Sequence, residues 1–328
     1  MSFIPKALIH VHQYYFLSME LLKAQKMLLG LAIGDALGKE YENIPRIQIH
    51  INDPLKGYKG GTGIYTDDTQ MSLAVAELMS SNLPFNEETL ASSLVYAYRR
   101  DKRSGYSSFT KTMLETSWCG MDFLKSVSGQ DKLNRKSDGS SMRAVPVGLF
   151  PDTNEVIRHA QINSEITHSH PKAILASIGV ALASHYSYYT YGDPSEIIRY
   201  VIKNLPPIDH NYSSYLSSID TLSNPDYQII LGKYSDYGPP YNDAKYVLGM
   251  VLFILKQFSQ NPEAAIVHSL RFGGDVDTTL SIILGIVMMN NTVDQIPQLL
   301  IDDLENGGYG KDHLMSIGKA LDEKYPVM

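Results

Sequence analysis

The sequence predicts an all-α protein, and two observations favour that fold class. Apolar residues recur at the 3.6-residue spacing of buried helices along nearly the whole chain. Alternating apolar and polar runs, which are typical of strands, are short and scarce. The chain has no repeat of fixed period, no low-complexity tract and no change in composition that marks a linker. We therefore expect one compact helical domain.

Helix periodicity and boundary signals place the predicted helices in order along the chain. They cover about 19–37, 67–80, 87–99, 109–127, 171–188, 194–203, 241–258, 262–272, 275–289 and 311–324. Pro171 can occupy the first turn of the helix that it begins. Turn-forming residues gather at 56–63, 126–141 and 205–240, which are predicted to be loops where functional side chains could lie.

The composition excludes several classes of protein. The 328 residues carry a net charge of −7 without a basic cluster, so neither nucleic acid nor a membrane is an expected partner. Hydrophobic residues at 44% and charged residues at 19% exclude disorder as the main state. Cys119 is the only cysteine, which excludes a disulfide framework and a Cys-rich metal site. No run of 18 apolar residues and no clean signal core occur. We expect a cytoplasmic protein and a monomer.

Two acidic segments begin predicted helices in the same way. The segment 66–69 (Thr-Asp-Asp-Thr) precedes apolar residues at 71, 74, 75, 78 and 79. The segment 273–278 (Gly-Gly-Asp-Val-Asp-Thr) precedes apolar residues at 280, 283, 284, 287 and 288, with the same spacing. Each segment therefore places its acids in the first turn of a helix with a buried face.

These acids have two interpretations. In the simpler one, Thr66 and Asp275 are N-caps and the other acids complement the helix dipole. A cap needs only one side-chain oxygen, however, and each segment supplies two carboxylates and a hydroxyl. If the two helix starts face each other, the carboxylates repel by about 3 kcal/mol per pair at roughly 5 Å and an effective dielectric near 20. Hard cations such as Mg²⁺, Ca²⁺ or Mn²⁺ would neutralise this oxygen-only set, and two ions would match it.

Four segments resemble, in the expected order, the motifs of the ADP-ribosylglycohydrolase family. They are 30–38 (Gly-Leu-Ala-Ile-Gly-Asp-Ala-Leu-Gly), 66–71 (Thr-Asp-Asp-Thr-Gln-Met), 137–143 (Ser-Asp-Gly-Ser-Ser-Met-Arg) and 273–278. The family includes dinitrogenase-reductase-activating glycohydrolases and ADP-ribosyl-acceptor hydrolases. The resemblance implies a single compact orthogonal helical bundle over 27–328, preceded by an N-terminal extension, 1–26, to which we assign no role.

The resemblance also implies a site that contains two Mg²⁺ ions, or Mn²⁺. By position, the metal ligands would be Thr66, Asp67, Asp68, Asp275, Asp277 and Thr278. Glu42 matches a family glutamate on a loop by the metals, and Glu40 is the competing candidate. Asp68 or Glu42 would orient the attacking water or protonate the leaving group. Asp35 would either lie near the metals or cap a neighbouring turn.

A substrate cleft is implied in the same way. Its residues would be Ser137, Asp138, Gly139, Ser140, Met142, His168 and Tyr106. Asp138 stands where the family often has Asn, and serines at 107, 137, 140 and 141 stand where Gly or Ala is common. His168 matches a family histidine at the cleft, although a capping or surface role is the alternative, and His170 is expected to be a bystander. The glycines at 30, 34 and 38 predict close helix packing rather than phosphate binding.

The implied function is hydrolysis of the N- or O-glycosidic bond that joins ADP-ribose to a protein side chain, with two divalent ions as cofactors. The expected partner is an ADP-ribosylated protein or another ADP-ribose-containing substrate. Two alternatives stay open. One is a metal-dependent hydrolase of another ADP-ribosyl compound, either a small molecule or a nucleobase. The other is a non-catalytic ADP-ribose-binding member of the family, which the complete set of acids argues against.

Overall fold

A computed structural model describes residues 21–45, 48–50, 53–190, 192–207, 210–232 and 242–327. The described residues form α-helices and short 3₁₀-helices and contain no β-strand. The α-helices are α2 (Lys23–Gly38), α3 (Asp67–Ser80), α4 (Glu87–Arg100), α5 (Ser108–Thr116), α6 (Gly120–Ser128), α7 (Thr153–Glu165), α8 (Pro171–Tyr189), α9 (Ile197–Asn204), α10 (His210–Thr221), α11 (Tyr227–Leu231), α12 (Ala244–Phe258), α13 (Pro262–Leu270), α14 (Val276–Val287), α15 (Gln298–Asp302) and α16 (Lys311–Lys324). The predicted all-α fold class is confirmed.

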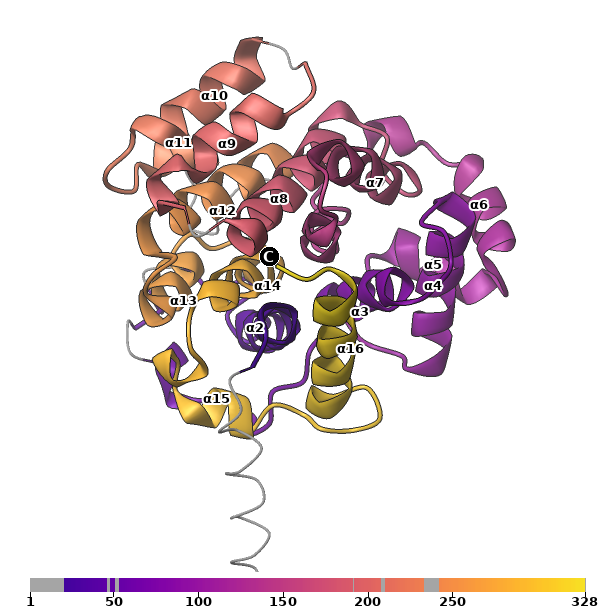
Figure 1. The fold of residues 1–328 in the computed structure, drawn as a ribbon, viewed down its shortest axis with the longest axis horizontal. Coiled ribbons are helices and arrows are strands. Elements are labelled where there is room, and N and C mark those ends of the chain that lie inside the picture. The colour runs from indigo at the N-terminus through magenta and orange to yellow at the C-terminus, as the bar shows by residue number, and fades with distance from the viewer. Residues whose placement is uncertain are drawn as a thin grey trace, which may run out of the picture.

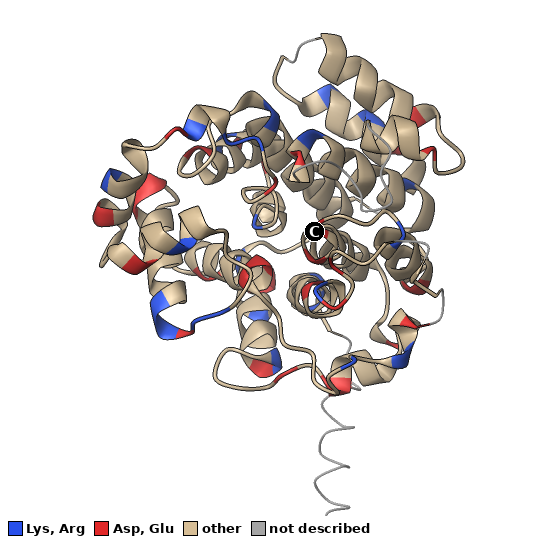
Figure 2. Cartoon of the chain, turned by 180° about the vertical axis from the view of Figure 1, so that it is seen from behind, with Lys and Arg blue, Asp and Glu red and all other residues tan. Residues whose placement is uncertain are grey.

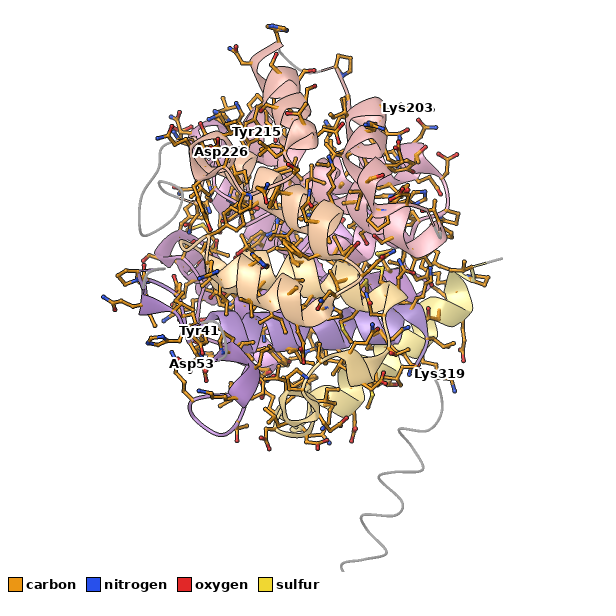
Figure 3. The ribbon with its side chains drawn as sticks, turned by 90° about the vertical axis from the view of Figure 1, so that its left-hand side faces the viewer. Tyr41, Asp53, Lys203, Tyr215, Asp226 and Lys319 are labelled. Carbon is orange, nitrogen blue, oxygen red and sulfur yellow. The ribbon has the colours of Figure 1, made fainter. Side chains whose placement is uncertain are left out.

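Helix α2 lies in the middle of the molecule, where it packs against α14, α16 and α3 (Figures 1 and 3). Its glycines bring it unusually close to α14. A Cβ atom at Gly34 would lie 2.4 Å from the carbonyl oxygen of Leu280, and Gly30 and Gly38 meet the α14 backbone in the same way. The prediction that these glycines serve helix packing is confirmed, and the two helices behave as one central unit.

The predicted helix boundaries differ from the structure in three places. The segment predicted as one helix over 109–127 is two, because the chain breaks between α5 and α6 and Gly120 packs tightly on α4. Helix α7 is not predicted, since its buried face includes the polar His159 and Asn163, which mask the apolar period. Helices α10 and α11 lie in 205–240, which was predicted to be a loop; their buried residues are Tyr212, Tyr215, Leu216, Ile219, Ile230 and Leu231.

Helix α2 begins at Lys23, upstream of the predicted domain boundary at 27, and most of the predicted extension lies outside the described residues. Basic and acidic residues are interspersed along the outer helices (Figure 2). None of the described helices combines the length and the apolar character that a membrane span requires. The fold therefore has a densely packed, mostly apolar centre around α2 and α14. The buried acids of this centre differ from the apolar residues that surround them.

Candidate active site

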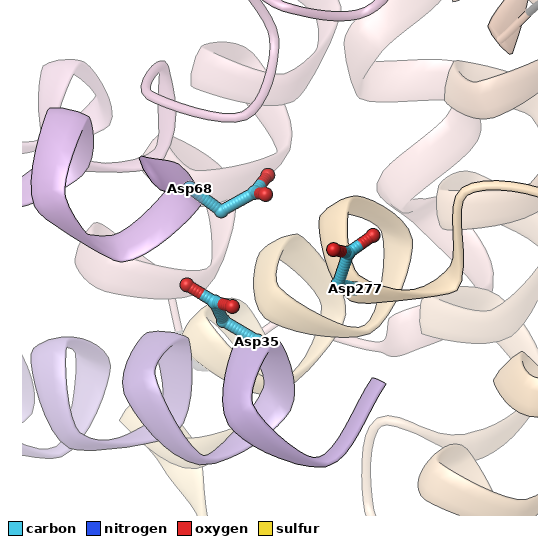
Figure 4. A group of neighbouring side chains, drawn as sticks. All are labelled: Asp35, Asp68 and Asp277. Carbon is cyan, nitrogen blue, oxygen red and sulfur yellow. The ribbon is translucent and has the colours of Figure 1, made fainter. Parts of the chain in front are cut away.

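Three buried carboxylates from three different helices converge at the centre of the fold (Figure 4). They belong to Asp35 of α2, Asp68 of α3 and Asp277 of α14, and one oxygen of each lies within 4.8 Å of the others. Asp35 is fully buried, whereas Asp68 is 3% and Asp277 is 7% exposed. The two acidic helix starts therefore face each other, as the metal interpretation requires.

Asp35 holds the start of α3 in place. Its carboxylate accepts hydrogen bonds from the backbone N–H of Thr66 at 2.9 Å and from that of Thr69 at 2.9 Å. The hydroxyls of the same two threonines donate to it at 2.8 and 2.7 Å. Asp35 thus caps a neighbouring turn, which is one of the two alternatives predicted for it, and it also lies among the acids. Thr66 occupies the N-cap position of α3, as the simpler interpretation predicts, but its side chain bonds Asp35 and not its own helix.

The start of α14 has a different construction. Gly273 and Gly274 both adopt left-handed backbone conformations, with φ of 70° and 82°, which turn the chain into the helix. Asp275 accepts a hydrogen bond from the backbone N–H of Thr278 at 3.4 Å, so its predicted role as an N-cap is confirmed. The amide of Asn242 donates to the other oxygen of Asp275. This start is therefore held by its own turn and by one loop residue.

A direct hydrogen bond joins the two helix starts. The hydroxyl of Thr278 donates to the Asp68 carboxylate at 2.6 Å, although the two residues are 210 positions apart in sequence. The hydroxyl of Thr66 lies 3.4 Å from the other Asp68 oxygen. These contacts join Thr66, Asp68 and Thr278, and the charges of Asp67 and Asp275 also act on Asp68.

Burial and mutual repulsion raise the pKa values of the clustered acids. The pKa of Asp68 and that of Asp277 lie well above the ordinary range, first because of burial and then because of neighbouring aspartates. The same causes raise the pKa of Asp67 well above its usual value and that of Asp275 to about 7. Within the described part of the chain, none of these four carboxylates pairs with Lys or Arg. The charged cluster therefore needs protons or cations for neutralisation.

The loop before α5 closes one side of the cluster. Gly105 approaches Asp67 so closely that a Cβ there would lie 1.9 Å from the Asp67 carboxylate. The Tyr106 hydroxyl donates to the side chain of Gln70 on α3 at 2.6 Å, and its ring meets Tyr98 edge-on. Tyr106 is half-buried beside the acids, whose charge contributes to raising its pKa. This loop thus covers Asp67, as expected for the wall of a cleft.

The third motif and His168 form a second group next to the acids. The Ser137 hydroxyl lies 3.1 Å from Nε2 of His168, and the Thr167 hydroxyl lies 2.8 Å from its Nδ1. Gly139 lies under the His168 ring, where a Cβ would approach to 3.1 Å. His168 is 2% exposed, so the surface alternative for it is wrong. His170 caps α8 instead, in agreement with its predicted bystander role.

The remaining residues of this motif differ in accessibility. Asp138 is 4% exposed, and its Oδ2 has no hydrogen-bond partner among the described residues. Burial, together with the charges of Asp277 and Asp67, raises the pKa of Asp138 to about 8. Ser140 and Met142 are buried. Ser140 accepts a hydrogen bond from the Ser164 hydroxyl, and the Met142 carbonyl accepts one from Ser72, so both anchor the loop.

The two candidate glutamates lie in the turn after α2. Glu40 accepts a hydrogen bond from the backbone of Lys59 at 2.9 Å, which ties it to another loop. Glu42 is exposed, and its charge contributes to raising the pKa values of Asp275 and Asp277. Of the two, Glu42 is therefore the residue whose charge reaches the α14 start.

Sequence reasoning missed several supporting residues. Asn242, which bonds Asp275, lies within a segment without a recognisable motif. Thr69 and Arg143 stand inside the recognised motifs but were assigned no role. Arg143 is 1% exposed and donates to Asn163 and Thr167 and to the Gly139 carbonyl, so it fixes the loop under His168. A buried arginine directly after a small-residue loop was the available signal for this role.

The donor chemistry of the cluster fits a hard divalent cation. It consists of carboxylate and hydroxyl oxygens alone, the preferred ligands of Mg²⁺ and Mn²⁺. The ligating oxygens come from two helix starts that a direct hydrogen bond holds together. The residues that could hold such ions are Thr66, Asp67, Asp68, Asp275, Asp277 and Thr278.

Several known proteins are similar to this chain. The ADP-ribosylglycohydrolase family matches residues 19–327. A protein from Archaeoglobus fulgidus is 26% identical over 79% of this chain and 85% of its own length. ADP-ribosylhydrolase ARH3 of Danio rerio is 25% identical over 82% of this chain and 83% of its own. ADP-ribosylarginine hydrolase Tri1 of Pseudomonas putida is 42% identical over only 25% of this chain and 23% of its own.

The fold has a counterpart among solved structures. A chain described as an ADP-ribosylglycohydrolase-related protein complex superimposes with a TM-score of 0.69 at 19% identity, and the match covers 92% of this chain and 97% of the other. The family match, the relatives and the shared fold point the same way. This chain belongs to the ADP-ribosylglycohydrolase family and is a hydrolase of the glycosidase type.

Proposed function

We propose that this protein removes ADP-ribose from modified protein side chains and that it needs two Mg²⁺ ions, or Mn²⁺, to do so. The observation that carries the proposal is the facing of the two acidic helix starts, with buried carboxylates that lack a Lys or Arg partner among the described residues. The names of two relatives, an ADP-ribosylarginine hydrolase and an ADP-ribosylhydrolase, support the choice of substrate class.

The two ions would be held by the cluster that contains Asp67, Asp68 and Asp277. When bound, they would stabilise negative charge on oxygens of the substrate or of water, which is the chemistry that a hard cation supplies in a hydrolase. Asp35 would support the metal ligands of α3, because all four groups that donate hydrogen bonds to it belong to Thr66 and Thr69. It holds the α3 ligands in position rather than contacting the substrate.

In the proposed reaction, a water oxygen forms a bond to the anomeric carbon of the distal ribose. The bond from that carbon to the side-chain nitrogen or oxygen breaks, and the leaving atom takes up a proton. Asp68 is buried and receives the Thr278 hydroxyl, whereas Glu42 is exposed and can exchange protons with solvent. We therefore assign the proton transfer to Glu42 in preference to Asp68.

The loop Ser137–Gly139 would receive the ribose or the diphosphate. His168 keeps this loop in place, because its two ring nitrogens meet the hydroxyls of Ser137 and Thr167. Burial and the nearby arginines hold the pKa of His168 well below its usual range, so the ring is neutral at physiological pH. A neutral ring can accept and donate one hydrogen bond each, which suits a positioning role.

The test of the proposal is ADP-ribose release from an arginine-linked and from a serine-linked ADP-ribosyl peptide. Protein treated with chelator is assayed with Mg²⁺ titrated from zero. We expect metal-dependent release from at least one peptide, and the responsive peptide identifies the acceptor. No release from either peptide at saturating Mg²⁺ and Mn²⁺ would contradict the proposal.

The role of Glu42 has its own test. Glu42→Gln removes the proton carrier and leaves the aspartate cluster intact, so turnover should fall by about 10² to 10⁴-fold. The variant should also lose one limb of the pH–rate profile and keep its Mg²⁺ affinity within a few-fold. Glu40→Gln is the matched control and should retain activity. An unchanged pH profile in Glu42→Gln would transfer the role to Asp68.

A second candidate substrate class is another ADP-ribosyl compound, either a small molecule or a modified nucleobase. The observation that favours it is Asp138, a buried carboxyl whose Oδ2 has no hydrogen-bond partner among the described residues. The Asp138→Asn variant separates the two classes. If release from peptides rises in this variant, Asp138 tunes the enzyme away from protein substrates, whereas a loss of release indicates that the carboxyl serves the peptide reaction.

A further inference from the structure

The Arg135 guanidinium is a half-buried cation without a polar partner. Within the residues that the structure describes, it makes no hydrogen bond or ion pair, and its Nε is buried with no acceptor nearby. Its guanidinium carbon lies 3.6 Å from the centroid of the Phe109 ring. Burial lowers the pKa of Arg135 to about 10, and no carboxylate acts against that shift. An arginine that stays charged in such a place normally has an anionic partner.

Arg143, eight positions further along the chain, is a buried arginine with a structural role and serves as a comparison for Arg135. All three of its nitrogens donate, to Asn163, Thr167 and the Gly139 carbonyl, at 2.7 to 2.9 Å. Its hydrogen bonds satisfy the guanidinium inside the protein. Arg135 has none of these bonds, so packing alone does not account for its charge.

The position of Arg135 connects the two walls of the candidate cleft. Phe109 lies in the first turn of α5, directly after the loop that carries Gly105 and Tyr106. Arg135 itself stands two positions before Ser137, the residue that bonds His168. Burial, and after it the charge of Arg135, lowers the pKa values of His168 and Arg143. An anion at Arg135 would therefore lie beside the Ser137–Gly139 loop.

The charges around Arg135 limit which kind of substrate group can bind there. The centre of the site is a cluster of aspartates, which repels phosphates, and the whole chain carries a net charge of −7. A cation on the rim offers an anionic substrate an attractive contact away from that cluster. Guanidinium groups match phosphate oxygens in a planar, two-bond geometry, and stacking on an aromatic ring orients the plane in advance.

We propose that Arg135, stacked on Phe109, binds a phosphate group of the ADP-ribosyl substrate and so selects phosphorylated ligands. The proposal rests on the proposed function, because it assumes an ADP-ribosyl substrate. It assigns Arg135 to substrate specificity and leaves bond cleavage to the aspartate cluster and Glu42. The bound phosphate supplies the anionic partner that the Arg135 guanidinium lacks among the described residues.

The test measures the affinity of the full-length protein for ADP-ribose and for adenosine by calorimetry at saturating Mg²⁺. Arg135→Gln should weaken ADP-ribose binding by ~10-fold to 100-fold, the usual effect of losing a charged hydrogen-bond pair. Adenosine, which lacks phosphate, should bind the variant as it binds the wild type. Arg135→Lys keeps the charge without the planar fork and should fall between the two. Lys125→Gln, which removes one positive charge from exposed α6, should leave both affinities unchanged.

Thermal unfolding supplies a second measurement. Without ligand, Arg135→Gln should melt at the wild-type temperature or above it, because the variant no longer buries an unpaired charge. The rise in melting temperature that ADP-ribose gives the wild type should shrink in the variant. A lower melting temperature in the absence of ligand would overturn the proposal, since it would assign Arg135 to the packing of Phe109.

The outcomes separate this proposal from the proposed function. If the wild type fails to bind ADP-ribose, the proposed function fails and this proposal fails with it. If the wild type binds and Arg135→Gln binds equally well, only the role of Arg135 is overturned. The role is also overturned if Arg135→Gln raises KM for a modified peptide while ADP-ribose affinity stays constant, because the anion then belongs to the acceptor.

Discussion

The two acidic helix starts have similar sequences, yet the protein holds them in different ways. At the start of α3, the backbone N–H groups of Thr66 and Thr69 and both of their hydroxyls bond Asp35, a residue of the central helix. At the start of α14, Asp275 caps its own helix after two left-handed glycines, and Asn242 supplies an outside contact. Both halves of the site thus contact α2, but the α3 start is tied to it by side-chain hydrogen bonds, whereas the α14 start packs its backbone against Gly38 and is capped within its own turn.

This difference indicates a division of labour. The α3 half is anchored to the buried core, so its oxygens keep their places whether or not a cation is bound. The α14 half receives fewer side-chain hydrogen bonds from outside its own turn, so we expect it to adjust more than the α3 half when a ligand arrives. The two similar motifs are therefore expected to differ in rigidity. The predictions below test that contrast, beginning with the largest expected effect.

The largest effect should come from removing one ligand from each half. Asp68→Ala and Asp277→Ala should each lower metal-dependent turnover by at least ~100-fold, because even second-layer partners of metal ligands contribute 10-fold to 100-fold. In chelator, both variants should be more stable than the wild type, since each relieves repulsion in the buried cluster. Steady-state assays and thermal melts measure the two effects. Asp294→Ala, at an exposed acid, is the control, and near-wild-type turnover in both variants would exclude the two-metal site.

The next effect should separate the two halves. In Asp35→Asn, a single amide oxygen replaces the carboxylate that accepts hydrogen bonds from four donors of Thr66 and Thr69. The α3 ligands would then be held less firmly, so Mg²⁺ affinity should fall by about 10-fold to 100-fold. Asn242→Ala removes a single contact to Asp275 and should lower the affinity by less than about 10-fold. Mg²⁺ titrations of activity and of melting temperature give both values. Equal losses in the two variants would show that the halves do not differ in rigidity.

A third effect concerns the helix pair that carries both Asp35 and Asp277. Gly34→Ala would place a Cβ 2.4 Å from the Leu280 carbonyl oxygen, so α2 and α14 must move apart. The variant should lose about 1 to 3 kcal/mol of stability, measured by denaturant unfolding. Gly60→Ala introduces the same methyl group where nothing lies within 4 Å and should be neutral. Equal stability of the two variants would argue against the close helix contact.

The last effect should appear in the pH dependence of stability. Burial raises the pKa of Asp275 to about 7 and that of Asp138 to about 8, both above the value of 3.8 in the unfolded chain. The folded protein therefore binds more protons than the unfolded chain in this range, and stability should fall as pH rises from about 4 to about 8. Melting temperatures in chelator should show this decline, and saturating Mg²⁺ should flatten it. Increasing stability over the same range in chelator would contradict the raised pKa values.

The sequence was informative where chemistry and periodicity coincide. The spacing of apolar residues predicted the all-α fold and helix α3, and the two acidic motifs predicted the residues that meet in the centre. The face-to-face arrangement of those motifs could not be derived, because it depends on contacts across 210 residues. Helix α7 escaped prediction because polar groups such as Asn163 are buried in its face. Asn242 and Arg135 escaped because a lone residue in a loop has no pattern.

The contact between α2 and α14 also constrains the order of folding. The Ser281 hydroxyl donates to the Leu31 carbonyl, a contact that closes 250 residues of chain. Loop-closure entropy makes such distant pairings slow, and a chain growing on the ribosome cannot form this one until α14 has emerged. Helices α2 and α3 are both synthesised before α14, so the α3 half of the site can assemble first. The enzyme therefore gains its second set of acids only after the 210 residues that separate Asp68 from Thr278 have been synthesised, when the chain around it can already be compact.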